Sequence, residues 1–224
     1  MGLSMCPPKV ARDKIHTKED TMVIVGVYAD VMGSGKTSFA RAVVNALDER
    51  HAVAWINFAD PIKDISQSVA KRLGHDRPQA FRAKLSPVRV GDVVVDPRQF
   101  QQKFGTDLMR RHFGEDIWAE VWRADVLASG ADVVIVDDVR FHNEARVIRA
   151  LNGSLVKISR PGVRAPRLHW RIRAAITSWL PVMHSSEGRL SGVTPDFFVN
   201  NTGSLADLSH HAEAIIKELD LHAR

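Results

Sequence analysis

The sequence predicts an α/β domain built on a five-stranded parallel sheet flanked by helices. Short apolar runs alternate with helical patterns along most of the chain, which is typical of parallel strands joined by helical crossovers. The 224 residues are 45% hydrophobic and 25% charged, which suits one globular domain with at most a small inserted subdomain. A third observation, a glycine-rich turn after the first apolar run, narrows the range of α/β folds that the chain can adopt.

The predicted elements follow these patterns in chain order. The predicted strands are Met22 to Tyr28, Ala52 to Asn57, Asp132 to Val136, Ser154 to Ser159 and Asp196 to Asn200. The predicted helices are Thr37 to Glu49, Ile62 to Leu73, Pro97 to His112, Asp116 to Ala128, Asn143 to Leu151, Pro166 to Leu180 and Leu205 to Leu219. The stretch from Gly74 to Asp96 contains two prolines and is predicted to be an irregular insertion. Residues 1–20 are predicted to be a flexible tail before a domain of residues 21–224.

The segment from Val23 to Leu47 carries the glycine-rich turn. An apolar run breaks into the turn and reopens as a helix, a pattern typical of the phosphate-binding P-loop and therefore of the P-loop NTPase fold. Gly33 and Gly35, with Ser34 between them, let successive backbone N–H groups face inward, and Lys36 reaches the outer phosphates of a nucleotide. The sequence therefore predicts ATP binding at this turn.

The residues beside this turn predict a metal contact and show one departure from the motif. Thr37 or Ser38 offers a hydroxyl to Mg²⁺, and the helix that begins at Thr37 adds its positive end. Asp30 stands at the first glycine of the pattern G-x-x-x-x-G-K-[ST]. Because its negative charge would repel the phosphates, we expect the Asp30 carboxylate to point away from them.

The third predicted strand ends in two adjacent carboxylates, Asp137 and Asp138. Parallel strands place their C-terminal ends beside the phosphate loop, so a carboxylate there can hold Mg²⁺ or its waters, or orient an attacking hydroxyl. We expect one of the two to face the site and the other to be structural. Arg140, two residues further on, either neutralises these acids or contacts a phosphate.

Composition limits the class of protein and its partners. The net charge of +5 is concentrated in residues 160–173, a stretch with five arginines and no acid, which is either a solvated face or a phosphate-binding segment. The single cysteine, Cys6, excludes an intramolecular disulfide and a thiolate zinc cluster, and it favours a cytoplasmic setting. No apolar run approaches bilayer length, so no membrane partner is expected.

Taken together, the motifs resemble those of the deoxynucleoside monophosphate kinases of tailed bacteriophages, members of the P-loop nucleotide kinase fold. The resemblance covers most of the chain after residue 21. Besides the P-loop, it rests on FADPIKD (58–64), the R-x-x-x-Q-x-x-G-T-D run (98–107), GEDIW (114–118), DDVRFHNEA (137–145), HSSE (184–187) and NNTGSLADL (200–208). Each motif is weak by itself, but their order along the chain is fairly specific.

The resemblance implies transfer of the ATP γ-phosphoryl group to a (deoxy)nucleoside 5′-monophosphate, with Mg²⁺. It favours Asp138 over Asp137 as the carboxylate of the site, and it implies a lid at residues 160–183 and an acceptor-binding helical insertion at residues 74–130. Its implied phosphate contacts are Lys36, Arg140, Arg160, Arg164 and Arg167. Its implied acceptor contacts are Asp60, Lys63, Arg98, Gln102, Gly105 and Trp118, and those for the adenine of ATP are Asn201 and Thr202.

Some alternatives stay open at this point. Trp118 and Trp122 lie four residues apart and can equally be core residues of one helix. The protein can be another P-loop kinase, of the dephospho-coenzyme A or phosphomevalonate type, or a nucleic-acid-stimulated ATPase whose arginines bind backbone phosphates. The kinase interpretation predicts no stable nucleic-acid partner. A homodimer is compatible with the sequence, but nothing in it requires one.

Overall fold

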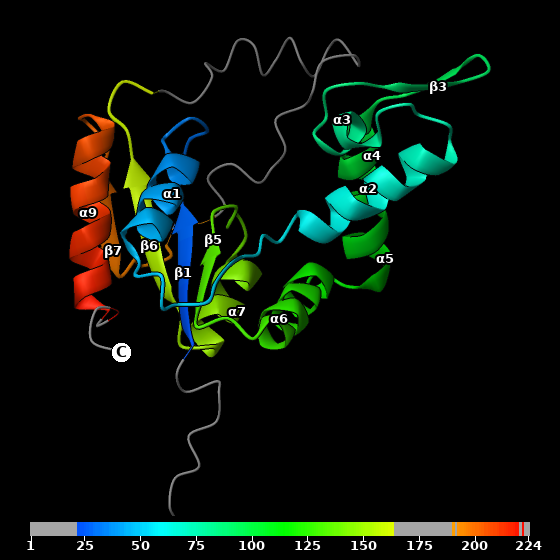
Figure 1. The fold of residues 1–224 in the computed structure, drawn as a ribbon. Helices are drawn as coiled ribbons and strands as arrows, with labels where there is room; N and C mark the ends of the chain where they lie inside the picture. The colour runs from blue at the N-terminus through cyan, green and yellow to red at the C-terminus, as the bar shows by residue number, and fades with distance from the viewer. Residues whose placement is uncertain (1–21, 164–189, 191, 220, 222–224) are drawn as a thin grey trace, which may run out of the picture.

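The computed structural model describes residues 22–163, 190, 192–219 and 221. Five parallel strands form its main sheet, in the order β2-β5-β1-β6-β7 (Figure 1). The strands are β1 (Val23–Tyr28), β2 (Val53–Trp55), β5 (Val133–Val136), β6 (Ser154–Ser159) and β7 (Phe197–Asn200). The five predicted strands and their parallel arrangement are therefore confirmed.

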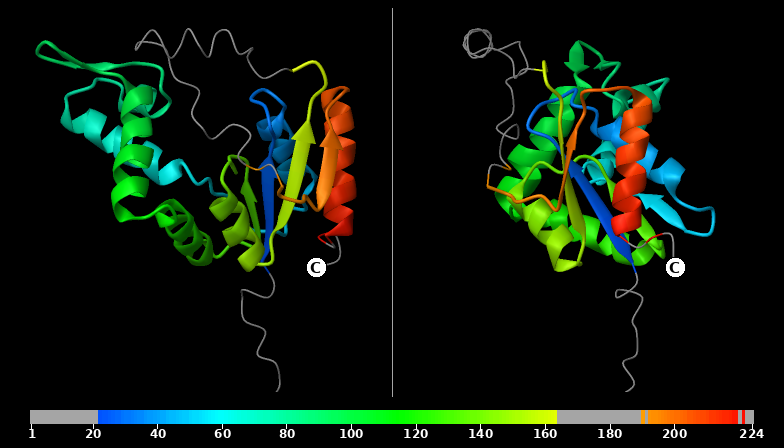
Figure 2. Two further views of the ribbon diagram at one scale, coloured as in Figure 1. Left: turned by 180° about the vertical axis from the view of Figure 1, so that it is seen from behind. Right: turned by 90° about the vertical axis from the view of Figure 1, so that its left-hand side faces the viewer.

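Helices cover both faces of this sheet. On one face lie α1 (Lys36–Ala46) and α9 (Leu205–Glu218), and on the other lie α6 (Ile117–Ser129) and α7 (His142–Ala150), as Figure 2 shows from two further sides. Alternate residues of β1 serve the two cores: Val25 and Val27 pack with α1 and α9, whereas Ile24 and Tyr28 pack with α6 and α7. Burial on both faces explains why the strands are continuously apolar.

A second, mostly helical part extends from one side of the sheet (Figure 1). It consists of α2 (Asp60–Arg72), α3 (Pro78–Arg82), the hairpin β3 (Val88–Val90) and β4 (Val93–Val95), α4 (Pro97–Gln102), the π-helix η2 (Lys103–Arg110) and α5 (Arg111–Phe113). Its small core contains Ala70, Phe81 and Val88, and Phe100 packs against it. The prediction of an irregular insertion at residues 74–96 was wrong, because this stretch forms a short helix and a hairpin.

The predicted helix from Pro97 to His112 is present, but it is not a uniform α-helix. Asp96 caps its start by accepting a hydrogen bond from the Gln99 backbone N–H (2.8 Å), and the chain leaves it at Gly114, where φ is 118°. Between these ends, Lys103–Arg110 forms a π-helix, a conformation that is rare and frequent at functional sites. The wider turn changes which side chains share a face of the helix.

The predicted lid helix (166–180) and the HSSE motif lie outside the described residues. Among the residues that the structure does describe, none of the helices combines the length and the apolar character needed to span a bilayer.

Candidate functional site

The loop between β1 and α1 has the backbone that the P-loop motif predicts. Gly33 and Gly35 have φ values of 84° and 96°, in the left-handed region that glycine enters without strain. Between them, the hydroxyl of the buried Ser34 donates to the Val31 carbonyl (2.6 Å), which fixes the curl of the loop. Lys36 begins α1, so its side chain leaves the loop at the positive end of that helix.

Asn201, directly after β7, packs against this loop and forms a hydrogen bond with its backbone. Its buried carboxamide Nδ2 donates to the Ser34 carbonyl (3.0 Å) and occupies the space that a Cβ on Gly35 would need. Asn201 therefore has a structural contact with the P-loop backbone, and its contact with the adenine of ATP stays a prediction. Thr202 is exposed beside it, and its contact with a nucleotide stays a prediction.

Asp137 faces the P-loop. The Thr37 hydroxyl donates to Oδ2 of Asp137 (2.5 Å), and Trp55 Nε1 donates to its Oδ1 (3.2 Å). Asp137 is 9% exposed, whereas Thr37 and Ser38 are both exposed at the start of α1. A hydroxyl and a carboxylate that meet at the mouth of a phosphate loop are the oxygen ligands that Mg²⁺ prefers. Thr37 and Asp137 therefore fit a magnesium ion bound together with a nucleotide.

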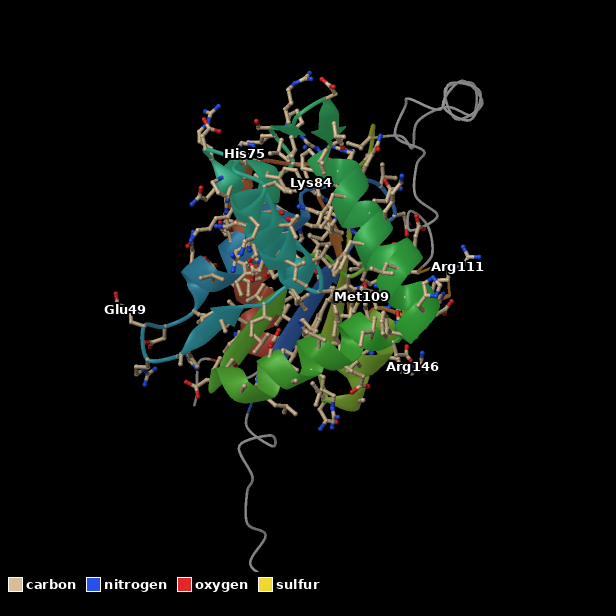
Figure 3. All side chains as sticks on the ribbon, turned by 90° about the vertical axis from the view of Figure 1, so that its right-hand side faces the viewer. Glu49, His75, Lys84, Met109, Arg111 and Arg146 are labelled. Atoms are coloured by element: carbon tan, nitrogen blue, oxygen red, sulfur yellow. The ribbon has the colours of Figure 1, made fainter. Side chains whose placement is uncertain are left out.

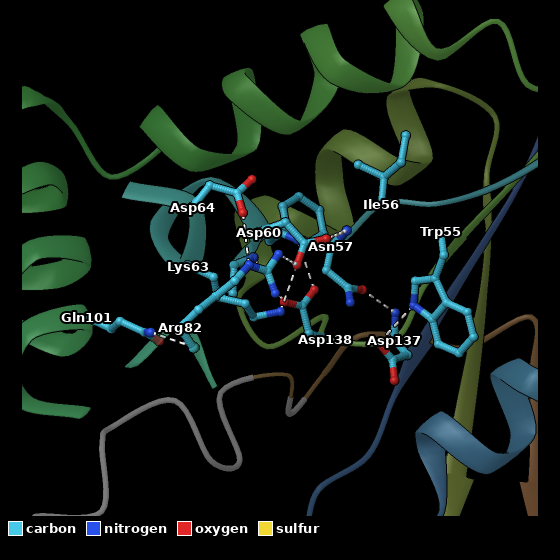
Figure 4. Close-up of polar contacts among 12 residues, drawn as sticks. Trp55, Ile56, Asn57, Asp60, Lys63, Asp64, Arg82, Gln101, Asp137 and Asp138 are labelled. Atoms are coloured by element: carbon cyan, nitrogen blue, oxygen red, sulfur yellow. Dashed lines mark hydrogen bonds and ion pairs between the residues drawn. The ribbon is translucent and has the colours of Figure 1, made fainter. Parts of the chain in front are cut away.

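Asp138 points in a different direction, toward the beginning of α2 (Figure 4). Its two carboxylate oxygens accept hydrogen bonds from the backbone N–H groups of Phe58 and Ala59, both at 3.0 Å. Desolvation raises the pKa of Asp138, and these two hydrogen bonds and the charge of Lys63 oppose that rise. The sequence favoured Asp138 as the metal carboxylate, but the residue that contacts the P-loop is Asp137, so the structure favours Asp137 for this role.

Two residues of the FADPIKD motif form an ion pair in the first turn of α2. Lys63 Nζ lies 2.7 Å from Asp60 Oδ1, and Asp60 Oδ2 accepts a hydrogen bond from the Asn57 backbone N–H (2.9 Å). The Asn57 side chain in turn accepts a hydrogen bond from the Asp137 backbone N–H (3.0 Å). These contacts, visible in Figure 4, connect the start of the helical part to the end of β5.

Lys84, which sequence reasoning missed, lies near the upper end of the helical part in the view of Figure 3. Its side chain is open to solvent, but protein surrounds it closely enough that desolvation lowers its pKa. The positive charges of Arg140, Arg98 and Lys63 lower that pKa further. Lys84 thus feels the positive charge of three cations from separate segments, opposed in part by the carboxylate of Asp138, and a net positive surrounding favours binding of an anion.

The backbone of Lys84 is also unusual. Its φ of 62° is one of two positive values among the described residues other than glycine, and such strain concentrates at functional sites. No local sequence pattern reports either this backbone or the convergence of cations, since the four residues lie on α2, after α3, on α4 and after β5. The sequence offers only a lysine two residues after a short helix.

Trp118 and Gly105 are packing partners, which corrects two of the acceptor predictions. Trp118 is 2% exposed, and its Nε1 donates to the Gly105 carbonyl (2.8 Å). A Cβ on Gly105 would lie 2.7 Å from Cδ1 of Ile62, so the absent side chain lets α2 approach η2. Trp118 therefore presents no free ring to a nucleobase, and Gly105 makes room for Ile62 rather than for a ligand.

Arg98 and Gln102 remain candidates on the same helix. Arg98 is exposed, and its charge acts on Lys84, while Gln102 is half-buried. The neighbouring Gln101 is structural, because its buried amide donates to the Ser66 hydroxyl and to the Arg82 carbonyl, both at 2.9 Å.

A second feature absent from the sequence prediction is an ion pair behind Arg140. Arg110, the last residue of η2, lies 2.9 Å from Glu144 and 4.0 Å from the centre of the Phe141 ring. Glu144 also accepts hydrogen bonds from the backbone N–H groups of Arg140 (2.7 Å) and Phe141 (3.1 Å). Burial, followed by the charge of Asp138, raises the pKa of Glu144 to about 7. This pair ties the helical part to the segment that carries Arg140.

The predicted lid arginines divide at the edge of the described structure. Arg160 is exposed just after β6, and Val163 approaches Gly33 of the P-loop, with 4.0 Å between Val163 Cγ1 and the position of a Cβ built on that glycine. The segment after β6 thus starts next to the phosphate loop. Arg164 and Arg167 lie outside the described residues.

A parallel sheet with a glycine-rich phosphate loop after β1 and a carboxylate at the end of the adjacent β5 defines a P-loop kinase fold. The family model described as deoxynucleotide monophosphate kinase matches residues 93–212, more than half of the chain. The chain belongs to this family, which confirms the resemblance found in its motifs. The matched region includes both carboxylates after β5, Arg98 and Asn201, but it begins after the P-loop.

Three curated relatives carry names of the same kind. The chain is 28% identical over 159 residues to a protein of Acanthamoeba polyphaga mimivirus whose name assigns deoxynucleotide monophosphate kinase activity provisionally, an alignment that covers 66% of this chain and 79% of the relative. It is 27% identical over 125 residues to the deoxynucleotide monophosphate kinase of Enterobacteria phage T4, covering 54% of this chain and 46% of the relative. It is 34% identical over 60 residues to the deoxynucleoside-5′-monophosphate kinase of Escherichia phage T5, covering 27% and 24%.

Proposed function

We propose that this protein transfers the γ-phosphoryl group of ATP to a deoxynucleoside 5′-monophosphate. The observation that carries the proposal is that the two carboxylates at the end of β5 have different neighbours. Asp137 contacts Thr37 of the P-loop, whereas the adjacent Asp138 lies on the side of Lys63 and Arg140, whose charges act on it. A phosphoryl donor in the P-loop and an anionic acceptor beside these cations would therefore meet at one strand end, as phosphoryl transfer requires.

The donor side would work by positioning and charge neutralisation. Backbone N–H groups from Gly33 to Lys36 would hold the phosphates, and the Lys36 ammonium would contact the oxygens of the transferred group. Thr37 and Asp137 would hold Mg²⁺, and Thr37 is preferred to Ser38 because its hydroxyl contacts the Asp137 carboxylate. When bound, Mg²⁺ would offset the negative charge of the phosphates.

The acceptor side would bind the dianionic 5′-phosphate through Lys63, Lys84, Arg98 and Arg140. The charges of Lys63, Arg98 and Arg140 lower the pKa of Lys84, and an anion bound beside Lys84 would offset this repulsion, so the site is suited to a phosphate. An oxygen of that phosphate would attack the γ-phosphorus, and the bond to the β,γ-bridging oxygen would break, giving ADP and the deoxynucleoside diphosphate. Gln102 would contact the base, and Asp60 would hold Lys63 in place.

The lid remains part of the proposal. Arg160, together with Arg164 and Arg167 outside the described residues, would close over the transferring phosphates and exclude water that would otherwise hydrolyse ATP. The start of this segment beside Gly33 supports that role.

A coupled assay of ADP formation tests the function directly. ATP and Mg²⁺ are supplied with each deoxynucleoside and ribonucleoside monophosphate, and with dephospho-coenzyme A as a competing acceptor. We expect turnover with one or more deoxynucleoside monophosphates and a loss of roughly two to three orders of magnitude in Lys36→Ala. Turnover only with dephospho-coenzyme A, or ATP hydrolysis stimulated only by DNA, would replace the proposal with one of the rival functions.

The acceptor assignment has its own test in Lys84. In Lys84→Met we expect the KM for the monophosphate to rise about tenfold, because a charge-assisted contact to phosphate is lost. The KM for ATP should stay within about twofold. Lys71→Met removes the same charge from an exposed position in the last turn of α2 and serves as the matched control. Equal effects of the two substitutions would remove Lys84 from the acceptor site.

A further inference from the structure

The P-loop of this chain contains a charge that the motif does not have. Asp30 replaces its first glycine, within one short loop of the residues that hold the phosphates. In the structure its carboxylate is paired: Oδ2 of Asp30 lies 2.8 Å from Nζ of Lys157. The expectation that this carboxylate turns away from the phosphate site agrees with this contact.

The partner of Asp30 comes from a different strand and is held in position by the sheet. Lys157 lies on β6 directly opposite Tyr28, the last residue of β1, so the lysine stands beside the point where the chain enters the P-loop. Its ammonium also lies 5.9 Å from the centre of the Tyr28 ring, and its side chain is 27% exposed, against 52% for Asp30. The parallel register of β1 and β6 therefore fixes where the positive charge sits.

An unpaired carboxylate at this position would oppose nucleotide binding. ATP carries several negative charges, and each would be repelled by a unit charge on the loop that surrounds them. A surface ion pair such as this one contributes little to folding, so the reason for the pair is better sought in the charge that the nucleotide meets.

We propose that Lys157 is a positioning residue of the nucleotide site, which cancels the charge of Asp30 and orients its carboxylate away from the phosphates. This inference rests on the proposed binding of ATP in the P-loop. Lys157 acts through Asp30 in this scheme and does not itself touch the nucleotide. It follows that Lys157 is needed only as long as residue 30 is acidic.

That dependence can be tested with four variants. Lys157→Gln, Asp30→Asn and the double variant separate the two charges, and Lys217→Gln removes a lysine from the last turn of α9, at the opposite end of the sheet from the P-loop (Figure 1). The Kd of ATP is measured by calorimetry at low and high KCl, the KM of the monophosphate is measured in the coupled assay, and thermal melting shows that each variant is folded.

We expect Lys157→Gln to weaken ATP binding about three- to tenfold at low salt, with a smaller loss at high salt. The double variant should return to within about twofold of the wild type, and Asp30→Asn alone should bind ATP at least as tightly as the wild type. The KM of the monophosphate and the properties of Lys217→Gln should not change.

Two results would overturn the inference. Wild-type affinity in Lys157→Gln would mean that the charge of Asp30 has no effect, and a double variant as weak as Lys157→Gln would mean that Lys157 contacts the nucleotide directly. Should Lys157→Gln fail to fold, weaker ATP binding by Asp30→Asn alone would contradict the inference. Because ATP binding is measured without an acceptor, a protein that binds ATP but phosphorylates no monophosphate would refute the proposed function and leave this inference standing.

Discussion

Replacing Asp137 and Asp138 separately by asparagine should produce two different kinds of damage. In Asp137→Asn the new side chain can keep both contacts of the carboxylate, since its oxygen can accept from Trp55 Nε1 and its amide can donate to the Thr37 hydroxyl. The protein should therefore fold normally. It loses the negative charge that we assign to Mg²⁺, and turnover should fall by roughly two to three orders of magnitude.

In Asp138→Asn the main loss should be in stability. Both carboxylate oxygens accept backbone N–H groups, from Phe58 and Ala59, and asparagine offers only one acceptor oxygen. One N–H then faces an NH₂ group, which costs about 1–3 kcal/mol. Desolvation already disfavours the charge on Asp138, so the neutral side chain recovers part of that cost, and a net loss of about 1–2 kcal/mol is expected. For a chain of this size, this loss corresponds to a Tm lower by roughly 2–8 °C.

Differential scanning calorimetry and a magnesium titration of the coupled assay distinguish the two variants. We expect Asp137→Asn to melt close to the wild type and to need more Mg²⁺ for its residual activity. Asp138→Asn should melt earlier and keep the magnesium requirement of the wild type. The opposite pattern, with the magnesium requirement changed only in Asp138→Asn, would return the metal site to Asp138 and refute the assignment made from the Thr37 contact.

Other substitutions test the surrounding contacts. Glu144 has a pKa raised from 4.5 to about 7, so the folded state binds more protons than the unfolded state between these pH values, and the contribution of Glu144 to stability falls as the pH rises through that interval. Chemical denaturation at several pH values should show this decline in the wild type and a weaker decline in Glu144→Gln. Equal slopes of stability against pH in the two proteins would contradict this expectation. Trp118→Phe should lower the free energy of unfolding by about 1–3 kcal/mol, because the Gly105 carbonyl loses a buried donor, and should leave the KM of the monophosphate unchanged; a raised KM with normal stability would restore Trp118 to the acceptor site. Gln102→Ala should raise that KM, or change the ranking of bases, with the KM for ATP within about twofold; steady-state kinetics with equal losses for both substrates would exclude Gln102 from the acceptor side.

Features that depend only on neighbouring residues could be predicted from the sequence. Five apolar runs form five strands because continuous burial on both faces of a parallel sheet leaves a pattern that can be read locally. The P-loop is equally local, since Gly33 and Gly35 take positive φ values within a few residues of Lys36. The order of the motifs was sufficient to indicate the family, which the family model confirmed.

The direction in which each side chain of a motif points could not be predicted in the same way, because it depends on the folded chain. Asp137 and Asp138 are adjacent, so they point in different directions, and neither residue records in its sequence context whether the P-loop or α2 lies on its side. The prediction that Gly105 contacts the acceptor failed for a related reason. Residues Lys103–Arg110 form a π-helix, and Ile62 packs against Gly105 in the folded chain. The charge of Lys84 interacts with those of three cations on other segments, and Lys157 forms an ion pair with Asp30, across many residues of intervening chain. A contact between distant segments depends on how the whole chain packs, and the composition around either residue does not specify it.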